Sequence, residues 1–251
     1  MRKYINTATG IVLLCGLFAG ACVKPPEQFD PRDGNIVYNG CRVKQIISQG
    51  SKYTPGFTRE FAYNNQNDPV SVTVPNAGTG NPNLIFRYDN RGRLIEYSGL
   101  YTNGGFEFMH TYGYRNNRIV TDTTRTLGAY SNPAGAWSKR YKYLSYDNLN
   151  RVVQDSEVYI TPVLETVIWQ YAYDATGNLV KNVGYDNKLN PHRTNKVWMF
   201  TDRNYSVNNE VGATSYNSAG LPLTFSATGP FSYVFANMYY YGEVNYVYDC
   251  K

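Results

Sequence analysis

A tyrosine-rich motif recurs along most of the chain and constrains its fold more than any other feature. The clearest copies are F-R-Y-D-N-R-G-R-L at residues 86–94 and Y-A-Y-D-A-T-G-N-L at residues 171–179, with weaker copies at 144–152 and 214–222. Two further copies, at 61–70 and 112–119, differ in the length of the turn. The repeated tyrosines are separated by 25 to 43 residues, so the period is irregular; they are Tyr63, Tyr88, Tyr114, Tyr146, Tyr173 and Tyr216.

Each copy has the physical properties of a β-hairpin. Two aromatic residues two positions apart lie on the same face of a strand. The following Asp or Asn initiates a turn by bonding to the backbone two residues on, and the glycine adopts the left-handed conformation that lets the chain reverse. Asp89, Asp147 and Asp174 are therefore interpreted as turn formers rather than as catalytic residues.

The motif and the composition together predict an all-β fold. The chain contains 25 Tyr, which favours strands, and 22 Gly and 12 Pro, which favour turns. No stretch after the N-terminal segment shows a sustained helical period. We expect an antiparallel up-and-down meander of about sixteen strands that forms a barrel-like or rolled sheet, with almost no helix. The repeat turns then lie at one end of the sheet and the variable loops at the other, and the three-residue spacing from Tyr143 to Tyr146 predicts a β-bulge.

The N-terminal segment has the features of an export signal. Arg2 and Lys3 precede a short apolar stretch at residues 10–18, and the small residues Ala19-Gly20-Ala21 precede Cys22. This arrangement resembles the bacterial lipobox, although Ala19 stands where Leu is usual. It predicts a lipoprotein signal peptide at 1–21, a lipid on Cys22 and anchoring to the outer membrane, on either its periplasmic or its cell-surface side. The alternative is an ordinary signal peptide cleaved nearby, with Cys22 left free.

The rest of the chain divides into a short linker and one domain. Residues 22–35 are polar and rich in proline, which predicts a flexible tether, and residues 36–251 form a single repeat domain. Cys41 and Cys250 are the cysteines that remain after export and acylation, and an exported protein permits a disulfide between them, two unpaired thiols being the alternative. A disulfide requires the first and last strands to be antiparallel neighbours, so we expect an even number of strands.

The ordered repeats resemble the YD repeats of Rhs-like proteins. More closely, the chain resembles the Tyr-rich YD-repeat envelope lipoproteins of Bacteroidota, an uncharacterised domain family described as porin-like in fold. The closer resemblance also rests on the lipobox, on Y-D-N-K-L-N-P at 185–191 and on Y-V-Y-D-C at 246–250. It implies a β-rich envelope lipoprotein and supplies no activity, because the family itself has none assigned.

The face pattern of the strands favours a sheet in water over a pore. Residues 106–114 place an aromatic or histidine side chain at every second position, with polar and mixed residues between. Residues 165–173 have a similar arrangement, in which Glu165 and Val167 precede Trp169, Tyr171 and Tyr173 on one face. A transmembrane barrel instead needs an aliphatic face with aromatics at its rims. His110 lies on the aromatic face and is predicted to be a core residue, whereas His192, beside Arg193 in a variable loop, is expected to face solvent.

Charge and motifs exclude several classes of function. The formal net charge is +5, and removal of Arg2 and Lys3 with the signal leaves +3, without a basic run interleaved with aromatics, so nucleic acid is not an expected partner. The sequence lacks a phosphate loop, a nucleophile elbow and a zinc-spaced cysteine pair, and we expect no cofactor, no metal and no catalysis. The sequence does not exclude a pair of catalytic carboxylates for glycoside cleavage, because two residues far apart in sequence can lie close together in the fold. The candidates for such a pair are Glu96, Glu107, Glu157 and Glu165.

Two non-enzymatic functions remain. One is a binding module for a glycan or a protein partner, and the alternative is a structural or assembly accessory of the envelope without a small ligand. Because the repeat turns are short and uniform, a ligand site is expected among the variable loops at the other end. The long loop at 128–136, followed by Trp137, makes Tyr130 and Trp137 the candidate binding residues, and the alternative is that both cap the core.

Overall fold

The computed structural model describes residues 30–38, 40–50, 55–226 and 233–251. Contacts divide the chain into two units, Met1–Asp30 and Pro31–Lys251, and every strand belongs to the second. The described residues form seventeen strands, one six-residue α-helix and two short 3₁₀ helices, which confirms the all-β prediction. Within these ranges, no helix is long and apolar enough to cross a membrane. The predicted signal peptide, Cys22 and residues 22–29 of the predicted tether lie outside the described residues.

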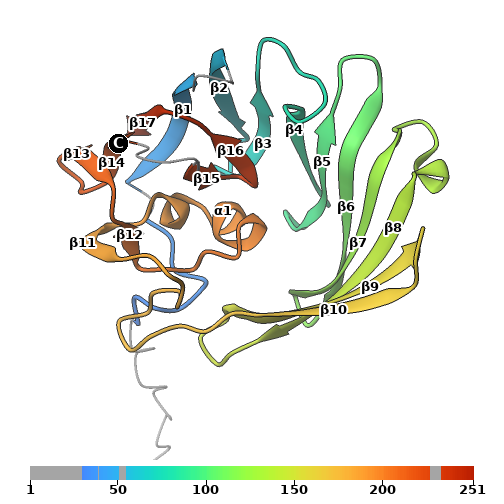
Figure 1. Cartoon of the computed structure of the whole chain (residues 1–251). Coiled ribbons are helices and arrows are strands. Elements are labelled where there is room, and N and C mark those ends of the chain that lie inside the picture. Colours follow the sequence, from blue (N-terminus) through green and yellow to red (C-terminus); the bar gives the residue numbers. More distant parts are fainter. Residues whose placement is uncertain (1–29, 39, 51–54, 227–232) are drawn as a thin grey trace, which may run out of the picture. The chain divides into compact units, whose positions relative to one another are not determined.

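Thirteen strands form one antiparallel sheet that curves around a central filling (Figure 1). It is not closed, because β10 and β13 remain as edges. In spatial order its strands are β10 (Glu165–Gln170), β9 (Val152–Thr161), β8 (Ser138–Tyr146), β7 (Arg118–Ala129), β6 (Gly105–Arg115), β5 (Leu94–Leu100), β4 (Asn83–Tyr88), β3 (Pro69–Thr73), β2 (Pro55–Tyr63), β1 (Cys41–Gly50), β17 (Glu243–Cys250), β14 (Pro222–Ser226) and β13 (Ala213–Tyr216).

The other elements pair outside this sheet. Two small antiparallel sheets join β11 (Tyr185–Leu189) to β12 (Asn208–Glu210) and β15 (Tyr233–Phe235) to β16 (Met238–Tyr240). The helices are η1 (Pro133–Gly135), η2 (Pro191–Thr194) and α1 (Lys196–Thr201).

The first and last strands are antiparallel neighbours as predicted, although the strands in the described residues number seventeen. The expected even count assumed that every strand continues one meander. Instead the chain leaves the main sheet after β10, forms β11 and β12, and leaves it again for β15 and β16. The total number of strands therefore does not determine whether the last strand runs antiparallel to the first.

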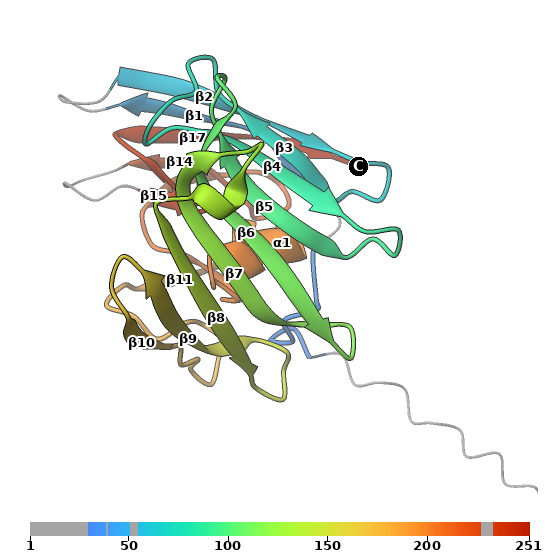
Figure 2. The ribbon, with the colours of Figure 1, turned by 90° about the vertical axis from the view of Figure 1, so that its right-hand side faces the viewer.

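The repeat turns share one hydrogen-bonding pattern. In five of them the side-chain oxygen of the Asp or Asn accepts the backbone N–H groups of the second and fourth following residues, at 2.9 to 3.0 Å; these are Asn64, Asp89, Asp147, Asp174 and Asn217. The third following residue has a positive φ in each, for example Gly92 at 71°, which explains why Gly or Asn stands there. The repeat turns β2–β3, β4–β5, β6–β7 and β8–β9 lie in succession along one edge of the sheet, as expected (Figure 2).

The repeated tyrosines fasten neighbouring hairpins to one another. All but Tyr216, whose hydroxyl bonds to the carboxylate of Asp186, donate to a backbone carbonyl at the start of the return strand of the adjacent hairpin. Tyr88 donates to Pro69 and Tyr114 to Leu94, both at 2.8 Å. The same bond is made by Tyr63, Tyr146, Tyr173 and Tyr248. The ladder register shifts just before the tyrosine in several repeats, and the shift between Ser145 and Tyr146 confirms the predicted bulge.

Arginines cover these tyrosines from the neighbouring repeat. The guanidinium carbons lie 4.1 to 5.0 Å from the ring centroids in the pairs Arg42–Tyr63, Arg93–Tyr114, Arg118–Tyr146 and Arg151–Tyr173. Arg93 and Arg151 are also ion-paired at 2.7 Å with the turn aspartates of their own repeats, Asp89 and Asp147. The hairpins are thus linked through side chains as well as through the strand ladder.

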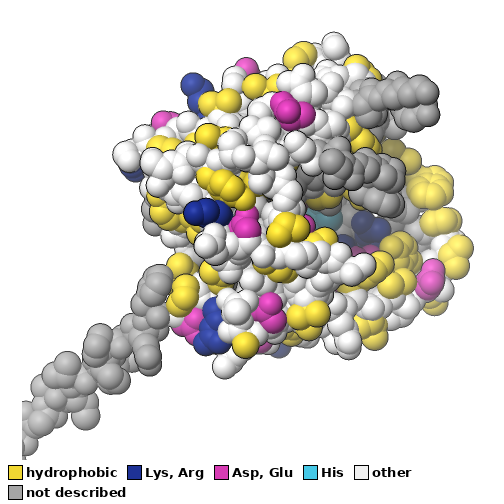
Figure 3. Space-filling view, turned by 60° about the vertical axis from the view of Figure 1, so that its left-hand side comes forward, with side chains coloured by type: hydrophobic (Ala, Val, Ile, Leu, Met, Phe, Trp, Pro, Cys, Tyr) yellow, Lys and Arg dark blue, Asp and Glu magenta, His cyan; other side chains and the backbone are white. Residues whose placement is uncertain are grey.

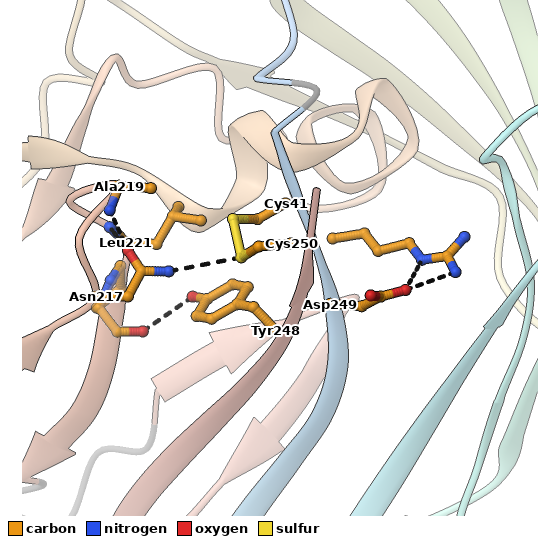
Figure 4. Close-up of a disulfide and its surroundings, with 9 residues drawn as sticks. Cys41, Asn217, Ala219, Leu221, Tyr248, Asp249 and Cys250 are labelled. Carbon is orange, nitrogen blue, oxygen red and sulfur yellow. Dashed lines mark hydrogen bonds and ion pairs between the residues drawn. A yellow bond between two sulfur atoms is a disulfide. The ribbon is translucent and has the colours of Figure 1, made fainter.

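The Cys41–Cys250 disulfide closes a repeat that is split between the two ends of the domain. The bond is present, as predicted, between the facing residues Cys41 in β1 and Cys250 in β17 (Figure 4). Tyr248 and Asp249 supply the tyrosine and the acid of this repeat, and Arg42 supplies the arginine that pairs with the acid at 2.7 Å. The disulfide stands where the other repeats have a peptide turn.

The concave face of the sheet is filled by α1 and by the β15–β16 hairpin. Trp198 of α1 is fully buried and meets Phe61 and Phe86 edge-on, with ring centroids 5.6 and 5.4 Å apart. Phe235 and Tyr240 from the hairpin are also fully buried in the same core cluster. The filling covers the inner face of β1–β5, β14 and β17.

His192 and Arg193 are buried, so the expectation that His192 faces solvent is wrong. The ring of His192 lies 2.7 Å from Asp202, and its other nitrogen lies 2.9 Å from Asn190. Arg193 donates to the carbonyls of Asp33 and Ile36 at 2.8 and 3.1 Å. Residues 31–35, the end of the predicted tether, are therefore held against the domain together with Ile36.

Candidate functional site

The two residues expected to bind a ligand lie near each other in sequence but not in one cavity. Trp137 is 65% exposed, which makes it a surface residue and not a core cap. Tyr130 is half-buried, donates its hydroxyl to Glu96 at 2.9 Å and lies under the guanidinium of Arg87. It lines an open depression with residues 103–105 and 128–131, to which Trp137 does not contribute.

A polar cavity opens on the concave face beside the filling. This concave-face cavity has a volume of about 550 Å³ and is lined by residues of β5–β10, by Tyr171, by residues 201–203 at the C-terminal end of α1, and by Val234 and Asn237. Figure 3 looks toward this side of the molecule, where a hollow shows histidine and Lys or Arg side chains among hydrophobic ones. Its volume suits a ligand of one or a few sugar rings or a similar small molecule.

A histidine–aspartate pair forms one wall of the concave-face cavity. The Nδ1 atom of His110 lies 2.8 and 3.0 Å from the carboxylate oxygens of Asp122, and Thr124 donates to the same carboxylate at 3.1 Å. Burial acts to raise the pKa of Asp122, but the charge and the hydrogen bond of His110 outweigh it and hold the pKa below its ordinary value. With Nδ1 held by Asp122, the Nε2 atom is the nitrogen of His110 left to bind a ligand.

Three further ion pairs cross the cavity wall. Glu157 in β9 lies 2.5 Å from Lys142 and 3.7 Å from Arg140, both in β8. Arg203 donates to both oxygens of Asp155 at 3.1 and 3.3 Å. Burial alone lowers the pKa of Arg203, but Asp155 raises it above its ordinary value, so this guanidinium stays charged. The wall presents oriented donors and acceptors whose charges are already compensated.

Aromatic rings complete the lining. His110 is stacked between Tyr97 and Tyr112, with ring centroids 5.5 and 6.2 Å apart. At the open side, the lining includes Tyr171 and Trp169, and the Trp169 ring is 53% exposed on the edge strand β10. Burial raises the pKa of Tyr171 to about 12, so its hydroxyl keeps its proton at neutral pH and remains a donor. Flat apolar faces beside fixed polar groups are what a sugar ring requires.

A second cavity lies at the repeat-turn end, where the sequence predicted none. This repeat-turn cavity, of about 430 Å³, is lined by the turns at 91–94 and 116–119, by Gly34 and Asn35, and by residues of α1. The sequence predicted no cavity at this end because each repeat turn, taken alone, is too short to enclose one. The cavity forms because α1 and residues 34–35 pack across several turns.

The described residues contain no group of three His, Cys, Asp or Glu side chains arranged to hold a metal ion. The only sequence signal for the lining of the concave-face cavity is the two-residue spacing of polar side chains along a strand. Asp155, Glu157 and Tyr159 have this spacing and share the inward face of β9. Their partners come from β8 and from the segment after α1, which no local pattern identifies. Of the four candidate glutamates, Glu107 and Glu157 line this cavity, and Glu96 and Glu165 do not.

Comparison with known proteins adds little to this geometry. No family model matches the chain, and no curated protein matches it. Among solved structures, a chain of the crystal structure of TcdB2-TccC3-Cdc42 matches with 11% sequence identity and a TM-score of 0.22, over 70% of this chain and 9% of that chain. The matched region is thus a small part of a much longer protein.

Proposed function

We propose that this protein is an outer-membrane-anchored lipoprotein that binds a glycan in the concave-face cavity without chemically changing it. The observation that carries the proposal is the combination of exposed and half-buried aromatic rings with compensated ion pairs in one cavity. Sugar rings stack on aromatic faces, and their hydroxyl groups exchange hydrogen bonds with fixed donors and acceptors. The lipid anchor on Cys22 rests on the sequence motif and on the resemblance to Bacteroidota envelope lipoproteins.

The state of the carboxyl groups supports binding over glycoside cleavage. A glycosidase needs one carboxyl whose pKa is raised so that it can donate a proton at neutral pH. Asp122 has a lowered pKa, and Glu157 is held by two cations. Both groups are suited to accept hydrogen bonds from a ligand.

The experiment is titration of the purified protein with a panel of soluble oligosaccharides, followed by isothermal calorimetry and thermal unfolding. Trp169→Ala is expected to weaken binding at least about tenfold, because stacking and apolar contact are lost. Its unfolding temperature should change little, since half of the ring is exposed. Trp137→Ala is the matched control, as it removes an equally large exposed ring outside the cavity.

Three outcomes separate the alternatives. Loss of binding in Trp169→Ala alone supports the concave-face cavity. Loss in Tyr130→Ala and Trp137→Ala, with Trp169→Ala unaffected, places the ligand at the variable loop. If no oligosaccharide stabilises the protein, the glycan proposal fails and a structural or assembly role becomes the better explanation.

A further inference from the structure

The repeat-turn cavity is positively charged. Its lining contains four cationic side chains, Arg91, Arg93, Arg118 and Lys196, and no Asp or Glu. The cations reach it from three directions, since Arg91 and Arg93 belong to the turn before β5, Arg118 begins β7, and Lys196 begins α1. A concave surface lined by one sign of charge concentrates ions of the opposite sign.

Two of the four cations are held rigidly. Arg93 is fixed by Asp89 at 2.7 Å and lies over the ring of Tyr114. Arg118 lies over the ring of Tyr146 and donates one Nη to the side-chain oxygen of Asn150. Asp89 offsets the charge of Arg93, but several N–H groups of both guanidinium forks remain free of hydrogen bonds to the described chain. A planar fork held in place loses little entropy when it binds an oxyanion.

The other two cations have no structural partner in the described part of the chain. The side chains of Arg91 and Lys196 are exposed and make no hydrogen bond or ion pair to residues that the structure describes. Arg91 follows the repeat aspartate by two positions, where the other repeats have Gln66, Leu149, Thr176 or Ala219. The turn therefore does not require a cation at this position.

We propose that the repeat-turn cavity binds a phosphate group, with Arg91 and Lys196 as its mobile ligands and Arg93 and Arg118 as its rigid ones. Guanidinium forks match the geometry of a phosphate, and charge-assisted bonds to a doubly charged oxyanion are stronger than those to a single carboxylate. The amide side chains of Asn116 and Asn117 add neutral donors on the same rim. This site is separate from the concave-face cavity and does not depend on glycan binding there.

The test uses the full chain carrying Cys22→Ser, so that no acyl group attaches, in a phosphate-free buffer at constant ionic strength. Calorimetric titration with pyrophosphate is expected to show one site, and acetate at the same ionic strength should not compete. Arg91→Gln and Lys196→Gln should each weaken the affinity about tenfold, and the double variant should weaken it about a hundredfold. Lys44→Gln is the matched control, because Lys44 is an exposed cation on β1 outside the cavity.

A vesicle arm distinguishes the source of the phosphate. Vesicles of phosphatidylcholine with and without phosphatidic acid are sedimented with the same proteins. Sedimentation that requires phosphatidic acid and is reversed by pyrophosphate identifies a lipid headgroup, whereas pyrophosphate binding without sedimentation identifies a soluble phosphate compound. The proposal is overturned if neither probe binds, or if Lys44→Gln weakens binding as much as Lys196→Gln does.

Discussion

Arg42 and Asp249 form the same ion pair across the disulfide that Arg93 and Asp89 form within a single turn. The separation of nitrogen and oxygen is 2.7 Å in both, although 207 residues separate the first pair and four the second. Each arginine then covers a tyrosine of the next hairpin, Tyr63 and Tyr114 respectively. The two ends of the domain therefore reproduce the tyrosine, the acid and the arginine of one repeat, with the disulfide in place of its turn.

Removal of the disulfide is expected to destabilise the domain substantially. The bond joins residues 209 positions apart, and the chain-entropy model assigns about 5 kcal/mol to a loop of that length. Denaturant unfolding of Cys41→Ser/Cys250→Ser should show a loss of about 3 to 5 kcal/mol. Adding reductant to the parent protein should produce the same loss and should leave the double variant unchanged. Equal stability of the parent with and without reductant would contradict the prediction.

The turn aspartates should act through their hydrogen bonds and not through charge alone. Asp147 accepts the backbone N–H groups of Leu149 and Arg151 and pairs with the Arg151 side chain. Asp147→Ala should therefore cost about 2 to 3 kcal/mol of unfolding free energy. Asp147→Asn should cost less than half of that, because Asn64 and Asn217 already form the same turn. If the two variants are equally destabilised, the ion pair dominates and the turn explanation is wrong.

Arg193 should tie residues 31–36 to the domain. It donates to the carbonyls of Asp33 and Ile36 and also to Tyr205, so Arg193→Lys leaves buried acceptors unpaired. We expect a loss of about 2 to 4 kcal/mol and faster proteolysis within residues 31–36. Arg115→Lys, at an exposed position, is the control and should behave like the parent. Unchanged proteolysis in Arg193→Lys would show that other contacts hold this segment.

The buried tyrosines should make the domain sensitive to alkali. Burial is the largest cause that raises the pKa values of Tyr114, Tyr146 and Tyr171 to about 12, from an ordinary value of 10.0. In the folded state these hydroxyls keep their protons at a pH where the unfolded chain loses them, so stability is full below pH 10 and falls between pH 10 and about 12. The absorbance of the last tyrosines to ionise should appear in that range together with the loss of the circular dichroism signal. Ionisation of every tyrosine near pH 10 with an unchanged circular dichroism spectrum would contradict this.

The sequence predicts the repeated part of this fold well because the information there is local. Asp89, Gly92 and Tyr88 each act within one hairpin or on its neighbour, and their spacing is enough to identify a turn and a strand face. The disulfide followed from the small number of cysteines. The sequence also placed Tyr130 and Trp137 correctly at the end of the sheet with the variable loops, but the two side chains do not line one cavity.

The segment that fills the concave face was not predictable in the same way. Residues 185–207 carry no repeat, and the helix α1 is too short for a periodic pattern to reveal it. His192 and Arg193 look like loop residues in sequence, and their burial depends on partners at Asp202 and Asp33. The concave-face cavity depends in the same way on Arg203, which meets Asp155 only after the chain has left the sheet and returned to it.

Because the two ends of the domain complete one repeat, the hairpins would keep their spatial order if the chain began at another loop. Since Asp249 and Arg42 already stand in turn geometry, a four-residue peptide such as the one after Asp89 could replace the disulfide and join β17 to β1 directly. New ends could then open in the exposed loop at η1, far from the repeat turns. Such a circular permutant would keep every repeat turn and every tyrosine bond, and it would fold in a reducing compartment where the natural arrangement loses its covalent closure.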